Sequence, residues 1–227
     1  MRFSQANGPL PSQKTVAPAE SALYHAARLC VSLLARLFFR FRVVGVARVP
    51  NTGGVIVAAN HASYFDIPFL GCALPRQTDY LAKRELFVLP LIGGLLRALG
   101  GLAVRRGQMD RQALAVAVEQ LQSGRMLTLY PEGTRSLTGR LAPAKPGIGM
   151  LVAQSGALVL PVYIHGTYRI RPFRLVTIVF GAPISFQPEI EAAQKEGMHS
   201  KKLYARIASR VIGEIEKLGE GTPLIGG

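Results

Sequence analysis

The positions of apolar residues along the chain predict short buried strands separated by helices. Runs of aliphatic and β-branched residues, bounded by Gly, Pro or polar residues, are typical of strands buried in a sheet. Such runs occupy 43–49, 54–59, 78–82, 101–104, 126–130, 158–164 and 175–180. The segments between them predict helices over 67–74, 110–122, 148–154 and from 199 or 200 to 218. Strands that alternate with helices indicate an α/β domain, with a mixed, largely parallel sheet flanked by helices.

The segment 20–42 has a different pattern, with one polar stripe on an otherwise apolar helix. The stripe recurs at spacings of three or four residues, at His25, Arg28, Ser32, Arg36 and Arg40. No uncharged run in this segment approaches the roughly 20 residues of a spanning helix. We therefore expect a membrane-associating amphipathic helix that lies in the interface, with its arginines toward the lipid headgroups. The alternative is a helix packed on the domain's own core.

The remaining parts of the chain divide into one domain and two ends. Residues 1–19 are rich in Pro, Ser, Gln and Gly without periodicity, so we expect a disordered tail. This tail lacks the apolar region of a secretory signal peptide. A single domain is expected over 43–218, followed by a flexible C-terminus over 219–227.

The composition is both basic and apolar, and this narrows the class of partner. The formal net charge is +14, while 49% of the residues are hydrophobic. Nucleic-acid-binding proteins are basic but polar, and here the basic residues are not interleaved with stacking aromatics. An anionic membrane surface is the better match. Cys30 and Cys72 form neither a disulfide framework nor a metal-binding spacing, and the histidines are scattered, so we expect a reducing compartment and no metal.

The first candidate site is the heptapeptide from Asn60 to Asp66, which follows the apolar run 54–59. It delivers His61 at a strand-to-helix switch, where α/β proteins usually bind ligands. Asp66 is close enough in the chain to fold back toward the imidazole. A histidine oriented by a carboxylate is sufficient for a general base, because the imidazole accepts a proton near neutral pH. The alternative is that Asp66 only caps the following helix and that His61 is an ordinary loop residue.

The second candidate site is the loop from Tyr130 to Ser136, which also emerges from the end of a strand. Gly133 allows close approach of the backbone to a ligand, Thr134 offers a hydroxyl, and Arg135 carries a fork suited to phosphate. The alternative is a tight turn with an internal pair between Glu132 and Arg135.

These two sites resemble the motifs of a known family. Asn60-His61-x-Ser63-x-x-Asp66 and Pro131-Glu132-Gly133-Thr134-Arg135-Ser136 are similar to the first and third motifs of the glycerolipid acyltransferases, in particular the bacterial lysophosphatidate (1-acylglycerol-3-phosphate) acyltransferases. Gly101-x-x-Val104-Arg105-Arg106 and Leu160-Pro161-Val162 lie where the second and fourth motifs fall. The resemblance covers roughly 43–180, and the helix over 20–42 is similar to the family's membrane-docking element.

The resemblance implies transfer of a fatty acyl group from an acyl-CoA or acyl carrier protein (ACP) thioester to the sn-2 hydroxyl of lysophosphatidate, with no cofactor. It implies His61 as the general base and Asp66 as the residue that orients it. No acyl-enzyme is expected, since the chain has no G-x-S-x-G elbow and neither cysteine lies in an activating context. The residues that would bind substrate are Glu132, Gly133, Thr134, Arg135, Arg105, Arg106, Lys145, Ser63 and Lys83. Lys83 is placed on the donor phosphates or at the interface, and Ser63 is either a local cap or a contact.

The acceptor stays open at this point, because Arg105 stands where lysophosphatidate enzymes often carry aspartate. Lyso-ornithine lipid, another lysophospholipid and glycerol-3-phosphate are the alternatives. A non-enzymatic alternative is a basic peripheral protein that binds anionic membranes. The expected location is the cytoplasmic face of the inner membrane, where the protein would be peripheral or monotopic.

Overall fold

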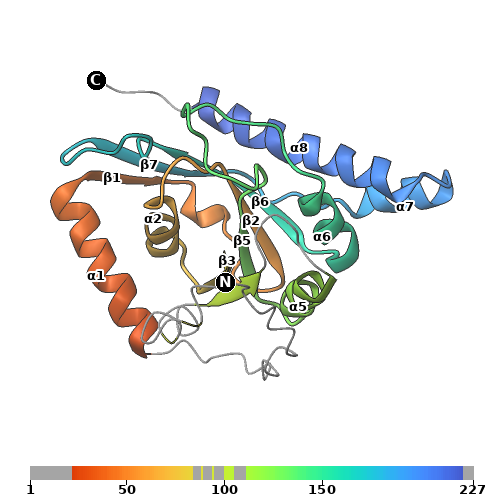
Figure 1. The fold of residues 1–227 in the computed structure, drawn as a ribbon, viewed down its shortest axis with the longest axis horizontal. Coiled ribbons are helices and arrows are strands. Elements are labelled where there is room, and N and C mark those ends of the chain that lie inside the picture. Colours follow the sequence, from red (N-terminus) through yellow and green to blue (C-terminus); the bar gives the residue numbers. More distant parts are fainter. Residues whose placement is uncertain (1–21, 84–87, 89–93, 95–99, 105–110, 222–227) are drawn as a thin grey trace, which may run out of the picture.

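The computed structural model describes residues 22–83, 88, 94, 100–104 and 111–221 (Figure 1). The expected tail over 1–19 and the arginine pair at 105 and 106 lie outside the described residues. In the described part, seven strands form one sheet, in the order β1-β7-β6-β2-β5-β3-β4. Every neighbouring pair is parallel except β6 and β7, which are antiparallel. The expected α/β architecture with a mixed, largely parallel sheet is confirmed.

With the exception of β1, the strands follow the predicted apolar runs closely. They are β1 (Arg40–Val44), β2 (Val55–Ala59), β3 (Thr78–Lys83), β4 (Gly101–Val104), β5 (Met126–Leu129), β6 (Leu158–His165) and β7 (Leu175–Phe180). All five residues of β2 are buried, which explains why its sequence is continuously apolar rather than alternating. The centre of the sheet is therefore covered on both faces.

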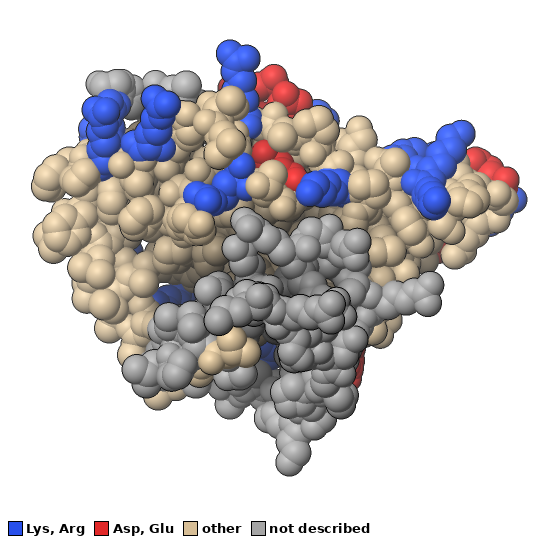
Figure 2. Space-filling model, viewed as in Figure 1, with Lys and Arg blue, Asp and Glu red and all other residues tan. Residues whose placement is uncertain are grey.

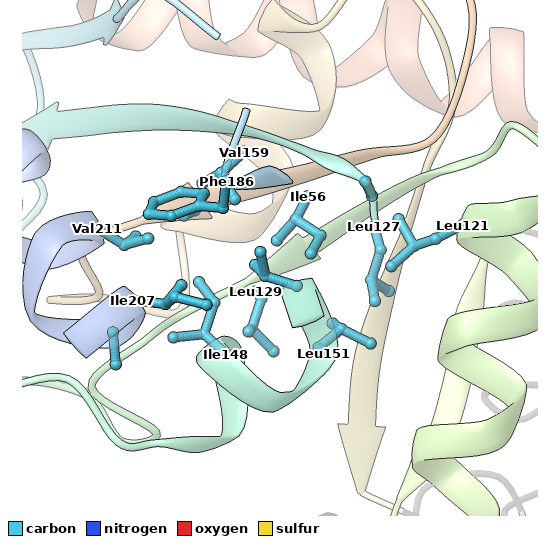
Figure 3. Packing of buried hydrophobic residues seen from close by; sticks show 14 of the residues in the cluster. Ile56, Leu121, Leu127, Leu129, Ile148, Leu151, Val159, Phe186, Ile207 and Val211 are labelled. Carbon is cyan, nitrogen blue, oxygen red and sulfur yellow. The ribbon is translucent and has the colours of Figure 1, made fainter. Parts of the chain in front are cut away.

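The helices cover the two faces of the sheet. They are α1 (Ala22–Phe38), α2 (Asp66–Ala73), α5 (Arg111–Gln122), α6 (Gly147–Ser155), α7 (Gln187–Lys195) and α8 (Ser200–Glu220). α5, α6, α7 and α8 share one hydrophobic cluster with the sheet, part of which is drawn in Figure 3. α1 and α2 contribute to a second cluster against the opposite face. α7 was not among the predicted helices.

The boundary between the N-terminal helix and the domain differs from the prediction. The helix ends at Phe38, and Arg40–Arg42 belong to β1 rather than to the expected helix over 20–42. The strand expected over 43–49 accordingly starts and ends earlier, and Val46–Arg48 form a 3-10 turn. The cause is pairing with β7, in which Arg40 lies opposite Leu175 and Val44 opposite Val179.

α1 packs on the domain with one side and exposes an apolar surface on the other. Its polar stripe turns partly inward: Arg28 and Ser32 are half-buried, and the Arg28 guanidinium lies 3.5 Å from the carbonyl oxygen of Pro75 at the end of α2. The leucines face outward instead, and Leu37 is 67% exposed. Burial of the small Ala35 lets the backbone of α1 approach its neighbours closely. The arginine at position 28 therefore braces two helices, and the outer surface of α1 is apolar.

The parallel strands bring their carboxyl ends to one edge of the sheet. β2 lies between β5 and β6 and is parallel to both, so the segments after Ala59, Leu129 and His165 leave the sheet on the same side. β7 and β1 begin at this edge, since His165 pairs with Thr177 and Leu175 with Arg40. We call it the carboxyl edge; both candidate sites lie along it.

We predict that the packing of α6 on α8 tolerates no side chain at Gly149. A Cβ there would overlap the carbonyl oxygen of Tyr204, whereas a Cβ at Gly213 within α8 would meet nothing within 4 Å. Gly149→Ala is expected to destabilise the protein by about 1–3 kcal/mol or more. Gly213→Ala, the matched control, is expected to stabilise it by up to about 1 kcal/mol. Urea unfolding measures both, and equal effects would contradict the predicted close helix contact.

Candidate active site

His61 and Asp66 meet at the carboxyl edge, where β2 gives way to α2. The Asp66 Oδ2 atom lies 2.8 Å from His61 Nδ1. The same oxygen accepts the backbone N–H of Ala62 at 2.7 Å and of Ser63 at 2.8 Å. Asp66 is fully buried and is the first residue of α2, where the helix dipole stabilises a negative charge. The carboxylate therefore both orients the ring and closes the turn that precedes the helix.

This hydrogen bond fixes which nitrogen of the imidazole is available. An ionised carboxylate only accepts, so Nδ1 carries the proton that is donated to Asp66. In the neutral imidazole the other nitrogen, Nε2, is then the unprotonated one and can take a proton from a ligand. The His61 side chain is 13% exposed, which leaves part of the ring accessible. The five-residue spacing predicted from the sequence thus gives a geometry suited to a general base.

Tyr130 holds the ring of His61 from one side. The two rings stack with their centroids 4.0 Å apart and an angle of 19° between their planes. The tyrosine hydroxyl is buried and finds no hydrogen-bond partner among the described residues. Burial of this hydroxyl raises the pKa of Tyr130 well above its usual value. Together, the stack and the Asp66 hydrogen bond define both the plane and the rotation of the imidazole.

Glu132 is directed into the protein. Its Oε1 accepts the backbone N–H of His61 at 2.8 Å, and its Oε2 accepts that of Ala142 at 3.0 Å. Only 3% of the residue is exposed. Burial raises the pKa of the Glu132 carboxyl, and the two N–H donors oppose that shift. The sequence predicted that Glu132 binds substrate or pairs with Arg135. In the structure, Oε1 joins the two site loops and Oε2 bonds within the loop after β5, so both oxygens are engaged with backbone N–H groups.

Further hydrogen bonds hold the two loops in place. The N–H of Ser136 donates to the His61 carbonyl oxygen at 2.7 Å. The N–H of Lys145 donates to the Pro131 carbonyl oxygen at 2.8 Å. Asn60 exchanges a pair of hydrogen bonds with the backbone of Ile164 on β6, at 2.7 and 3.0 Å. The histidine is therefore held on both sides, by the loop after β5 and by the adjacent strand β6.

The groups that remain open to a ligand are Gly133, Thr134, Arg135 and Lys145. Gly133 has a φ of +70°. The Lys145 side chain packs against it, since a Cβ at position 133 would lie 3.0 Å from the lysine Nζ. The Arg135 guanidinium stacks over the ring of Tyr64, 3.7 Å from its centroid. Such stacking leaves the in-plane N–H groups of arginine free for an anion. Two cations, Arg135 and Lys145, thus belong to the loop that adjoins His61.

The other predicted site residues have different positions. The Ser63 hydroxyl accepts the N–H of Phe65 at 3.3 Å, which is a local turn contact. Lys83 is the last residue of β3, at the carboxyl edge, and its side chain is outside the described part. Arg105 and Arg106 lie outside the described residues. Within the described residues, no three His, Cys, Asp or Glu side chains are grouped so that they could hold a metal ion.

Three contributors to the site were not assigned a role from the sequence: Asn60, Tyr64 and Tyr130. The signal for Asn60 is a polar residue at the end of an entirely buried strand, which must find a partner. The two tyrosines carry no such signal, because stacking on His61 and Arg135 depends on how separate loops are placed.

The family profile described as Acyltransferase matches residues 40–165, more than half of the chain. The protein belongs to this acyltransferase family. The described helices include none with the length and apolarity required to cross a bilayer.

Individual relatives agree with this assignment. The chain is 30% identical to a chloroplastic 1-acyl-sn-glycerol-3-phosphate acyltransferase of Arabidopsis thaliana, over 64% of this chain and 42% of that protein. It is 37% identical to a lyso-ornithine lipid O-acyltransferase of Pseudomonas aeruginosa, over 61% of this chain and 50% of that one. A crystal structure of the 1-acyl-sn-glycerophosphate acyltransferase PlsC from Thermotoga maritima matches with a TM-score of 0.65 and 27% identity, covering 85% and 79% of the two chains. The chain thus spans half or less of the length of these two curated relatives.

We predict that Glu132→Gln destabilises the fold. An amide oxygen accepts one of the two backbone N–H groups, but the amide nitrogen accepts none, so one buried donor loses its partner. The expected cost is about 1–3 kcal/mol in urea unfolding. Thr134→Ala, at an exposed position of the same loop, is the control and should change stability by less than about 0.5 kcal/mol. Unchanged stability of Glu132→Gln, with a raised KM for the acceptor, would instead make Glu132 a ligand-binding residue.

Proposed function

We propose that the protein is a membrane-associated O-acyltransferase that transfers a fatty acyl group from an acyl-CoA or acyl-ACP thioester to the sn-2 hydroxyl of lysophosphatidate, giving phosphatidate. The observation that carries this proposal is the His61–Asp66 pair, which leaves Nε2 of the imidazole free beside a loop with two cations. Family membership and the activities for which the relatives are named support the reaction class.

His61 supplies the proton acceptor that the reaction needs. An alcohol attacks a thioester poorly unless its proton is removed as the new C–O bond forms. Nε2 takes that proton, and Asp66 stabilises the resulting imidazolium. The tetrahedral intermediate then expels the thiol by breaking the C–S bond, and the imidazolium returns the proton to the departing sulfur. Transfer is direct, with no cofactor and no acyl-enzyme.

The acceptor phosphate is bound by the loop after β5. Arg135 is held flat by Tyr64 with its N–H groups available, and Lys145 lies against Gly133. Both cations favour a dianionic phosphate at the position that the loop encloses. We assign to Arg105 and Arg106 the role of adding positive charge at this position. We assign to Lys83 the binding of the phosphates of the acyl donor. Thr134 contributes a hydroxyl, and Gly133, which has no side chain, lets the backbone come close to the phosphate.

A different acceptor is favoured by one specific observation. The Pseudomonas relative at 37% identity is named a lyso-ornithine lipid O-acyltransferase. A lyso-ornithine lipid has no phosphate, so its binding would depend less on Arg135 and Lys145. It is therefore the second candidate, with the same chemistry at His61.

The protein is proposed to work at the cytoplasmic face of the inner membrane. The exposed leucines of α1 present an apolar surface, and the +14 net charge favours anionic lipid. A helix lying in the interface would bring the catalytic domain to lipid acceptors without crossing the bilayer.

The decisive experiment is an acyl-transfer assay with purified full-length protein. Acyl-CoA and acyl-ACP are each combined with lysophosphatidate, lyso-ornithine lipid, another lysophospholipid and glycerol-3-phosphate. The highest kcat/KM is expected with lysophosphatidate. Arg135→Ala should lower kcat/KM at least tenfold for phosphate-bearing acceptors, on the order of one lost charge-assisted hydrogen bond, and spare lyso-ornithine lipid. Absence of transfer to every acceptor would contradict the proposal.

We predict that His61→Ala lowers kcat by about 10²–10⁴, because the proton acceptor is lost. Thermal unfolding and vesicle binding of this variant should match the wild type. His165→Ala is the matched control: His165 also ends a strand at the carboxyl edge but has no role in the proposed reaction, so its kcat should stay near that of the wild type. An unchanged kcat of His61→Ala would exclude His61 as the proton acceptor. Absence of acyl transfer by the wild type, with vesicle binding intact, would instead support the non-enzymatic alternative, a basic peripheral protein that binds anionic membranes.

A further inference from the structure

A second group of basic and apolar side chains lies at the carboxyl edge, where β1 and β7 begin. It is formed by the connection between β6 and β7 and by the junction of α1 with β1. Its exposed members are Phe38, Arg40, Arg169, Arg171, Phe173 and Arg174, which we call the arginine rim. The two segments are joined by backbone hydrogen bonds, from Phe173 N–H to the Phe38 carbonyl at 2.6 Å and from Arg40 N–H to the Arg174 carbonyl at 3.0 Å.

The charges of the arginine rim are not neutralised within the described part of the chain. None of its four arginines forms an ion pair with a described carboxylate; only Arg169 has a ring contact, 5.4 Å above Tyr168. Figure 2 shows Lys and Arg side chains over the corner where Figure 1 places the start of β7, with the visible Asp and Glu elsewhere. Clustered like charges repel one another, so their arrangement favours an anionic partner.

The apolar members are exposed to solvent in the same place. Phe173 is 72% exposed and Phe38 is 44% exposed. Phe173 also has a φ of +64°, a left-handed conformation that favours Gly or Asn. Arg169, with a φ of +49°, is the other non-glycine residue with positive φ among the described residues. The chain thus places a large aromatic ring in water on a disfavoured backbone, and the ring gains little from the fold itself.

The location of the arginine rim relates it to the active site. β6 separates β7 from β2, and Asn60, next to His61, is bonded to Ile164 near the end of β6. The rim also continues directly from the C-terminal end of α1, where Leu37 is exposed. The C-terminal end of α1, the rim and the loops around His61 therefore lie along the same edge of the sheet.

We propose that the arginine rim is a second membrane contact, in which Phe173 inserts at the headgroup level of an anionic phospholipid bilayer and Arg171 and Arg174 bind its phosphates. Aromatic rings are favoured at the membrane interface, and arginines favour lipid phosphate. This combination favours a lipid surface over an acidic carrier protein, which would require the charges but not an exposed ring. The inference rests on the proposed function only in that the acceptor is a membrane lipid.

The test measures binding of full-length variants to vesicles made of equal parts phosphatidylglycerol and phosphatidylcholine. Phe173→Asn removes the ring and introduces a residue that tolerates positive φ, so thermal stability should be unchanged or higher. Its affinity should fall at least about fivefold. The double variant Arg171→Ser/Arg174→Ser should bind these vesicles roughly 30-fold more weakly than the wild type, about fivefold for each arginine. On vesicles of pure phosphatidylcholine, the difference between the double variant and the wild type should be much smaller.

The matched control is Lys201→Ser/Lys202→Ser, which removes two equally exposed charges at the start of α8. This helix start lies at the opposite end of the molecule (Figure 1). Its effect on vesicle affinity should stay within about twofold, because charges more than a Debye length from the surface are screened. An equal loss in the control and the rim variants would overturn the proposal, since net charge alone would then explain the binding.

A kinetic arm separates the lipid from a carrier protein. With a dispersed short-chain acceptor and no vesicles, rim variants should keep the wild-type KM for both acyl-CoA and acyl-ACP. Unchanged vesicle binding with a KM raised only for acyl-ACP would overturn the proposal in favour of a carrier site. If the wild type shows no acyl transfer at all, the proposed function fails, while the vesicle result still decides the membrane contact.

Discussion

The buried carboxylate of Asp66 is the interaction on which the candidate site depends. One of its oxygens accepts three N–H groups, from the His61 ring and from the backbone of Ala62 and Ser63. A fully buried charge is costly unless it is hydrogen-bonded, and these donors, together with the N-terminus of α2, provide the compensation. The turn that supplies these donors to Oδ2 is therefore the same turn that presents the imidazole. The orientation of the ring and the local fold depend on the same contacts.

The same principle extends to the neighbouring buried polar groups. Glu132 accepts backbone N–H groups from two loops, and Asn60 bonds to the backbone of the adjacent strand. Each removes a donor that would otherwise be buried without a partner. In consequence, the residues of the two site motifs divide into those that hold the loops and those that face a ligand. Arg135 and Lys145 remain on the open side, where their charge is available to a substrate.

The sequence predicted the sheet well because its central strands are continuously apolar, a pattern that only burial on both faces explains. It also predicted the contact between His61 and Asp66, since both residues lie in one short turn. It did not predict that Arg40–Arg42 are a strand: arginine at 36 and 40 fits a helical stripe, while Phe39, Phe41 and Val43 fit a strand period, and pairing with β7 decides between them. α7 was missed because, apart from the buried Ile190 and Ala193, its sequence is mostly polar and begins with a proline in the first turn.

The inward direction of Glu132 could not be predicted for a related reason. In the sequence, a glutamate followed by Gly, Thr and Arg is typical of a ligand-binding loop, and its true partners lie 71 and 10 residues away. The distant partner, His61, becomes a neighbour only because β2 and β5 are adjacent and parallel, which places both loops at the carboxyl edge. That edge also receives the starts of β1 and β7 and, with them, the exposed arginines and phenylalanines. A single consequence of strand direction thus places the imidazole, the exposed cations of the neighbouring loop and the proposed lipid-binding surface on one side of the molecule.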